Sequence, residues 1–149
     1  MDIGFLLASL DEAFHKKSWH GPNLRQSLRG VTVAQAAWRP QGERHNIWEL
    51  ALHAAYWKYV VRRRLTGEKR GSFALKGSNF FERPVERTQA AWNTDVALLE
   101  SEHDRLRSVV AKLSLSAHTP KALHLIRGAA AHDLYHAGQI RLLRRMCPL

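Results

Sequence analysis

Two histidines near the C-terminal end of the chain, His132 and His136, are spaced so that both could bind one metal ion. Residues four positions apart on an α-helix point to the same side, with Cβ atoms about 6 Å apart. Two imidazoles at this spacing hold the zinc ion in one large class of metalloproteases. The spacing is weak evidence by itself, because nine histidines in 149 residues produce such pairs by chance.

The apolar pattern around this pair strengthens the metal interpretation. At about 100° per residue, the side of the predicted helix that carries both histidines also carries apolar residues, namely Leu125, Ala129, Ile140 and Leu143. Arginines occupy the opposite side, at Arg127, Arg141 and Arg145. Buried imidazoles need polar partners, and two adjacent imidazoles cannot both be charged without strong repulsion. A shared metal ion satisfies both requirements, whereas the alternative is a pair of hydrogen-bonded core histidines.

A third ligand is expected from another helix, and two histidines qualify. His53 lies on the apolar side of a predicted helix, together with Leu50, Trp57 and Val60. His103 lies in the apolar stripe of the next long helix. A lone core histidine is usually structural, but opposite a helix that presents two more histidines either residue becomes a candidate ligand.

Three histidine ligands would leave at least one coordination position open, which is typical of catalytic rather than structural metal sites. A metal ion lowers the pKa of a water molecule or thiol bound there, and this produces a nucleophile near neutral pH. Imidazole ligands suit zinc, nickel, copper or iron by type. We expect zinc or nickel, with manganese or iron as alternatives.

Three polar residues near the histidines are candidate catalytic residues. Glu49 precedes His53 by one helical turn and could be a general base or orient an imidazole, although the helix dipole also favours a carboxylate near a helix N-terminus. Gln139 follows His136 by one turn and could bind water or substrate. Asp133 lies about 60° from the metal-facing side of its helix, where it could support a ligand.

Helical periodicity recurs in every long segment, and no segment has the alternation of a strand. Four long helices are predicted, over residues 3–14, 45–65, 92–113 and 119–145, with short helical turns over residues 23–38. The third long helix has apolar residues in steps of four and three, as in helices packed nearly antiparallel in a bundle. The fourth begins with Thr119 and Pro120, an N-cap followed by a first-turn proline. These patterns predict an all-α fold, a single four-helix-bundle domain over residues 1–149.

The connection between the second and third long helices spans residues 66–85. Loops of that length in a compact domain are usually functional or disordered. Three phenylalanines, Phe73, Phe80 and Phe81, favour a packed loop. Such a loop could close over a site as a lid, or simply be a crossover.

The composition is that of a basic globular protein without a membrane-spanning segment. The net charge of +10 predicts attraction to polyanions or to an acidic small molecule. Nucleic-acid binding is not expected, because aromatic residues are not interleaved with the arginines and no helix-turn-helix signature appears. The single cysteine, Cys147, and the absence of a basic, apolar leader predict a location in the reducing cytoplasm.

The sequence around the histidines resembles the DinB/YfiT-like family of metalloenzymes, over nearly the whole chain. The resemblance is carried by HNIWELALHAAYW at residues 45–57, by HDLYHAGQI at 132–140 and by RRRLTGE at 62–68. It implies a four-helix bundle with a long crossover, whose metal is held by one histidine of the second helix and a histidine pair of the fourth. The ligands that the resemblance implies are His53, His132 and His136.

The resemblance says less about the reaction. Relatives include thiol transferases that use glutathione, mycothiol or bacillithiol, together with a thiol-dependent isomerase, and members often dimerise. We therefore expect a metal-dependent enzyme that activates a thiol or water for transfer or hydrolysis on a small molecule. We also expect a homodimer, since Trp19 and Trp38 look exposed and would need cover. The alternatives are a non-catalytic metal-binding domain and a basic nucleic-acid-binding module of a stress response.

Overall fold

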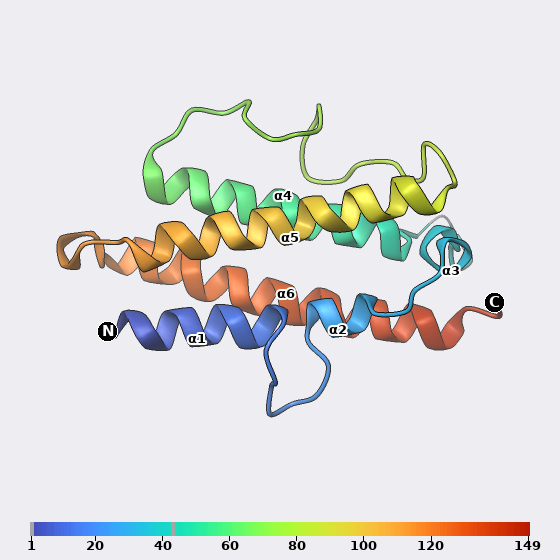
Figure 1. Cartoon of the computed structure of the whole chain (residues 1–149), viewed down its shortest axis with the longest axis horizontal. Coiled ribbons are helices and arrows are strands. Elements are labelled where there is room, and N and C mark those ends of the chain that lie inside the picture. Colours follow the sequence, from blue (N-terminus) through green and yellow to red (C-terminus); the bar gives the residue numbers. More distant parts are fainter. Residues whose placement is uncertain (1, 43) are drawn as a thin grey trace.

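The structure, a computed structural model, describes residues 2–42 and 44–149, and within them the regular elements are all helical (Figure 1). Four helices are long: α1 (Ile3–Phe14), α4 (Ile47–Thr66), α5 (Gln89–Ala111) and α6 (Pro120–Met146). Shorter elements lie between them: α2 (Leu24–Leu28), α3 (Val33–Ala37) and the 3-10 turn η1 (Leu115–Ala117). The prediction of an all-α fold is confirmed. None of the helices described is long and apolar enough to cross a membrane.

Capping residues fix where the two histidine-bearing helices begin and end. The side chain of Asn46 accepts a hydrogen bond from the backbone N–H of Glu49, and the Glu49 carboxylate accepts one from the backbone N–H of Asn46. This reciprocal capping box starts α4. Gly67 ends it with a φ of 76°, a left-handed conformation that glycine adopts without steric strain. Helix α6 starts at Pro120 after the N-cap Thr119, as the sequence predicts.

The four long helices lie side by side with their axes roughly aligned (Figure 1). Helix α5 packs on α4, and α6 packs on both α4 and α1. Helices α4 and α5 run in the same direction, because the chain between them returns along the length of α4 (Figure 1). The contact between α4 and α6 brings the C-terminal histidine pair opposite the middle of α4.

A layer of buried polar residues separates two apolar clusters of the core. One cluster includes Trp48, Leu52, Leu99 and Ile140. The other includes Leu6, Leu10, Leu106 and Ile126. On α4, α5 and α6 the change from one cluster to the other falls at Lys58, His103 and Asp133, and on α1 Asp11 lies one turn before it; all four residues are at most 2% exposed. We call these four residues the polar layer.

Charged side chains are almost never fully buried unless they are paired, and the charges of the polar layer are paired. The Lys58 ammonium donates a hydrogen bond to the Asp133 carboxylate. The Asp11 carboxylate accepts two hydrogen bonds from Arg107, at 2.7 and 3.0 Å. The layer therefore joins α4 to α6 by a charge-assisted hydrogen bond inside the core, and α1 to α5 by charge-assisted hydrogen bonds from the partly exposed Arg107.

Residues 67–88, which connect α4 to α5, are mostly exposed, but some of their aromatic side chains pack against the helices. The Phe81 side chain is buried in the first apolar cluster. The Phe73 ring stacks on Tyr59 with ring centroids 5.3 Å apart. The prediction of a packed loop is confirmed at these phenylalanines, which help to hold the connection to the helices.

Candidate metal centre

His53, His132 and His136 come together at the interface of α4 and α6. Nε2 of His132 lies 3.1 Å from Nε2 of His53 and 3.0 Å from Nε2 of His136. Two nitrogen ligands of one ion, with bonds of about 2.0–2.1 Å and an angle of about 90–110° at the metal, lie about 2.9–3.4 Å apart. The two measured distances fall in this range, and all three potential ligand atoms lie within 4.8 Å of one another, so the group could hold one metal ion.

Oxygen acceptors fix the second ring nitrogen of two of these histidines. Nδ1 of His53 donates to the carbonyl oxygen of Asn79 at 2.9 Å, and Nδ1 of His136 donates to Oε1 of Gln139 at 2.6 Å. A neutral imidazole that donates through Nδ1 carries its lone pair on Nε2. Metal-binding histidines are generally oriented by such partners. The hydrogen bonds therefore leave Nε2 of both rings free for a cation.

The surroundings keep all three imidazoles uncharged near neutral pH. Burial is the main cause, and it lowers the pKa of His53 to about 4 and that of His132 to about 3. Burial also lowers the pKa of His136. Charge on one ring would disfavour charge on the adjacent rings. Neutral imidazole is the form that binds a metal ion.

Without a cation, this cluster would leave nitrogen lone pairs facing one another. Because His53 and His136 donate through Nδ1, only Nε2 of His132 can carry a proton between the rings. That single N–H can form a well-aligned hydrogen bond with only one of its two neighbours. The other Nε2 would then be a buried acceptor without a donor, which is unfavourable. A divalent ion accepts all three lone pairs, so the donor set fits a metal.

Comparison with known families agrees with this geometry. The family model of the DinB superfamily matches residues 18–140, a range that includes all three histidines. The chain belongs to the DinB superfamily. Comparison with curated proteins and with solved structures gave no match. The resemblance inferred from the sequence is confirmed.

In this DinB superfamily member, the three histidines line a cleft of ≈ 1200 Å³, which we call the histidine cleft. Its other walls include the apolar side chains of Trp38, Leu142 and Met146. Phe80 forms one wall, because its ring stacks between His45 and His53 with centroid distances of 3.7 and 4.0 Å. Among the described residues, no aspartate or glutamate lines this cleft. Its lining would therefore leave the charge of a bound cation without a carboxylate to balance it.

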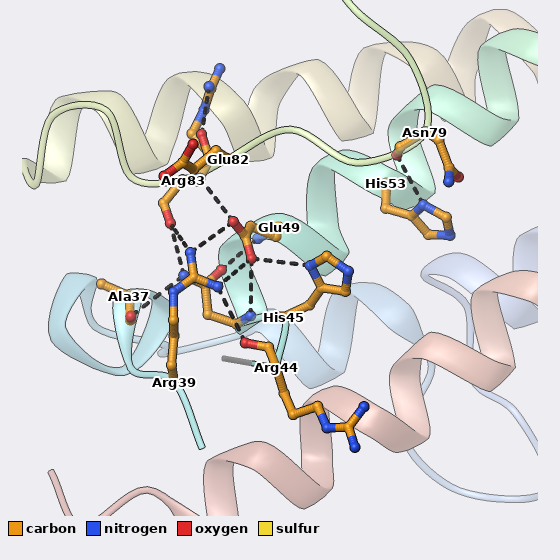
Figure 2. Close-up of polar contacts among 10 residues, drawn as sticks. Ala37, Arg39, Arg44, His45, Glu49, His53, Asn79, Glu82 and Arg83 are labelled. Carbon is orange, nitrogen blue, oxygen red and sulfur yellow. Dashed lines mark hydrogen bonds and ion pairs between the residues drawn. The ribbon is translucent and has the colours of Figure 1, made fainter. Parts of the chain in front are cut away.

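Glu49 lies one turn before the α4 ligand, but its carboxylate is engaged by the loops around the N-terminus of α4 (Figure 2). It accepts hydrogen bonds from Arg39 at 2.6 and 2.8 Å and from the backbone N–H of Arg83 at 3.0 Å. Burial acts to raise the pKa of Glu49, but these hydrogen bonds outweigh it and lower the pKa to about 2. Through these contacts, Glu49 joins two loops to α4. Its role as a general base stays a prediction.

Gln139 and Asp133, the other two candidate catalytic residues, have different surroundings. Gln139 accepts from the His136 ring and lines the histidine cleft. Asp133 is fully buried in the polar layer, where burial raises its pKa to about 6 despite the adjacent Lys58 ammonium. The hydrogen bond of Asp133 goes to Lys58 and not to a metal-centre histidine. A catalytic part for either residue stays a prediction.

His103, the alternative third ligand, belongs to the polar layer instead. Its Nδ1 lies 3.4 Å from the Lys58 ammonium. With Asp11 and His15 it forms a second group whose potential ligand atoms lie within 4.8 Å of one another. The Asp11 carboxylate is already paired with Arg107, and the Lys58 ammonium adjoins His103, so this second group is a poor site for another cation. The structure thus favours the α4 histidine as the third ligand of the main centre.

Asn79 and Phe80 take part in the site in ways that the sequence did not indicate. Asn79 has a φ of 67°, and it supplies the carbonyl that orients His53. Phe80 covers the same imidazole by stacking. The sequence feature that points to this contact is the run of Asn79, Phe80 and Phe81 in a long loop. It indicates that the loop is packed, but it does not indicate which helix residues the loop contacts.

Proposed function

We propose that this protein is a metal-dependent enzyme, in which His53, His132 and His136 hold the ion. The substrate would be a small molecule, and the reaction a transfer or hydrolysis that uses a thiol or water as nucleophile. The observation that carries the proposal is that three neutral imidazoles, two of them oriented by oxygen acceptors, meet at the wall of a large cleft. A structural metal site would be closed, whereas this one adjoins space for a substrate.

The charge of the histidine cleft supports an anionic nucleophile. Three neutral imidazoles do not neutralise a divalent ion, and the described lining offers Arg44 and His45 but no carboxylate. When bound, a divalent ion lowers the pKa of a thiol or water that coordinates it. A low-molecular-weight thiol fits this requirement, and the apolar wall of Trp38, Leu142 and Met146 suits an apolar co-substrate.

For the metal itself we propose zinc or nickel, with manganese or iron as alternatives, because all of them accept imidazole nitrogen. Elemental analysis of purified protein tests the ligand set. We expect stoichiometric metal in the wild type and in His103→Ala, and a sharp loss in His132→Ala. Equal metal in wild type and His132→Ala would refute the assignment.

A thiol-consumption assay tests the reaction. The protein would be loaded with zinc, nickel or manganese, and glutathione or bacillithiol would be offered with an aryl halide or an epoxide. We expect turnover that is lost in both His53→Ala and His136→Ala. The matched control is His20→Ala, since His20 is exposed in the turn between α1 and α2. Absence of turnover with every metal, together with tight, salt-sensitive DNA binding by the histidine variants, would favour a nucleic-acid-binding module.

We also propose a homodimer that forms through the exposed side of α6. Tyr135, Leu142 and Met146 lie there at helical spacing and are 65%, 59% and 53% exposed, and the same side chains line the rim of the histidine cleft. Contiguous exposed apolar residues of this kind often mark an interface. Light scattering at micromolar concentration should give the mass of a dimer, and Leu142→Glu should shift it to that of a monomer. A monomer mass for the wild type would end the proposal.

The remaining architectural expectations also stay proposals. We propose that residues 1–149 form one domain, a four-helix bundle of α1, α4, α5 and α6 with residues 67–88 as its crossover. We place the protein in the cytoplasm, because its one cysteine, Cys147, has no disulfide partner within the chain. Limited proteolysis that left one stable fragment spanning the four long helices would support the single domain, and two separately stable fragments would oppose it.

A further inference from the structure

A second cleft lies between the C-terminal half of α4 and residues 70–79 of the connection, and we call it the basic cleft. Its volume is ≈ 770 Å³. Four cationic side chains line it, namely Arg63, Arg64, Arg70 and Lys76. Its lining contains no aspartate or glutamate among the residues that the structure describes. Four like charges around one cleft repel one another unless something negative lies between them.

Local structure explains only part of this charge. Arg63 and Arg64 lie in the last turn of α4, where the helix dipole favours cations. Arg70 and Lys76 lie beyond the helix, on the loop, so the dipole does not account for them. The cleft thus gathers cations from two separate elements.

In the part of the chain that the structure describes, acidic residues do not balance most of these positive charges. Glu68 is the acidic residue nearest in sequence, but its carboxylate pairs with the buried Arg62 at 2.9 Å. Nε of Arg63 is buried without a hydrogen-bond partner, and Nη1 of Arg63 makes only a long contact of 3.5 Å with a backbone carbonyl. No ion pair joins Arg64, Arg70 or Lys76 to any described residue. Their hydrogen-bonding groups are available to a ligand.

The loop side of the basic cleft is held in place. The Tyr59 hydroxyl accepts hydrogen bonds from the backbone N–H groups of Gly71 and Ser72, at 3.1 and 3.3 Å. At the other end, the Trp57 indole N–H donates to Oδ1 of Asn79 at 2.9 Å. Because both ends of the segment are fixed to α4, little conformational freedom would be lost when the cleft binds a ligand.

We propose that the basic cleft binds a small polyanion, a molecule with two or more carboxylate or phosphate groups. Arginine guanidinium groups bind either group through paired, charge-assisted hydrogen bonds. Trp57 and Asn79 line both this cleft and the histidine cleft, so the polyanion lies next to the metal centre without occupying its open position. The site goes beyond the proposed reaction, since the cations do not need a metal to bind an anion.

The test is a titration of the full-length protein with two probes, pyrophosphate and tricarballylate, at low ionic strength. NMR would follow the amides of Gly71 and Gly77, and calorimetry would give the dissociation constant. We expect shifts at both glycines and binding that weakens with salt. In Arg63→Gln/Arg70→Gln, binding should weaken by at least about tenfold. A preference for pyrophosphate would assign phosphate esters to the cleft, and a preference for tricarballylate would assign carboxylates.

The matched control is Arg127→Gln/Arg145→Gln, which also removes two positive charges, from exposed positions on α6 that line neither cleft. It should bind both probes within about twofold of the wild type, because the screened charge of a distant surface contributes little. His132→Ala should also bind normally, which separates this site from anion coordination at the metal. Lys76→Gln, on the exposed loop, provides a second test if the double variant is unfolded. Absence of binding, an equal loss in the control, or a loss in His132→Ala would overturn the proposal.

Discussion

The backbone carbonyl of Asn79 accepts a hydrogen bond from Nδ1 of His53 at 2.9 Å, so a loop residue sets the tautomer of a histidine in the middle of α4. Asn79 presents that carbonyl from a left-handed conformation, with φ at 67°. Asparagine tolerates this region better than most residues. Its side chain adds a hydrogen bond from Trp57. The connection between α4 and α5 therefore contributes directly to the geometry of the metal centre.

This relationship predicts that the backbone conformation at Asn79 affects metal affinity. Valine is strained at positive φ, so Asn79→Val should displace the carbonyl and weaken metal binding by about tenfold, the lower end of the effect of losing a ligand-orienting partner. Glycine adopts positive φ freely, so Asn79→Gly should bind within about threefold of wild type although it lacks the Trp57 contact. Competition with a chromophoric chelator would measure both. Equal affinities for the valine and glycine variants would show that the carbonyl does not orient His53.

Gln139 should have the same effect on the second oriented histidine. Its Oε1 accepts from Nδ1 of His136 at 2.6 Å, and alanine removes that acceptor. Metal affinity in Gln139→Ala should fall by about 10–100-fold, measured by the same competition. Gln139→Glu keeps an oxygen acceptor at that position and should retain most of the affinity. Loss of affinity in the glutamate variant, with none in the alanine variant, would contradict the orienting role.

The parts of the site that lie on helices could be predicted from the sequence, because helical periodicity fixes which side of a helix faces the core. Periodicity placed His132 and His136 on the buried side of α6, and the structure brings both to the interface with α4. It could not choose between His53 and His103, since both lie on core-facing sides. Only the packing of α6 against α4 decides which of them meets the pair.

The loop contributions could not be predicted, because a loop has no periodicity to read. The path of residues 67–88 depends on contacts with residues distant in sequence, such as the stacking of Phe80 on His53.

The buried position of Lys58, in contrast, could be predicted. It lies one turn after Ala54 and one turn before Val61, both buried, so its position on the core side of α4 was visible in the sequence. Its partner Asp133 was not, since pairing across helices depends on their axial alignment.

Glu49 should contribute to stability in a pH-dependent way. Its folded-state pKa is lowered to about 2 from the ordinary 4.5, so the folded state favours the charged form. That stabilisation is fully present above pH 4.5 and is lost as the pH falls towards 2. At pH 7, Glu49→Gln should lower the free energy of unfolding by about 1–3 kcal/mol, the range for hydrogen bonds to a charged group.

Urea unfolding at pH 7 and at pH 3 would measure this difference. At pH 3 the gap between wild type and Glu49→Gln should be smaller than at pH 7, because part of the carboxylate contribution has been lost in the wild type. Asp104→Asn is a suitable control, since Asp104 is exposed on α5 and surface charges of this kind contribute little. A gap that stays constant between the two pH values would rule out linkage through Glu49.

The buried pair of Lys58 and Asp133 should show non-additive effects on stability. Lys58 is 2% exposed and Asp133 is 0% exposed, so removing one partner leaves the other as a buried ionisable group without its counter-charge. Lys58→Met should therefore lower the free energy of unfolding at pH 7 by about 3–5 kcal/mol. Methionine has nearly the length of lysine, so loss of volume contributes little to this expectation.

The double variant Lys58→Met/Asp133→Asn removes the unpaired carboxylate while keeping its shape. It should recover more than half of the stability lost in Lys58→Met, because replacing both charges of a buried pair costs much less than replacing one. Urea unfolding of wild type, both single variants and the double variant gives the coupling between the two residues. Strictly additive losses would mean that the ammonium and the carboxylate do not depend on each other, and the polar layer would then be a set of independent contacts.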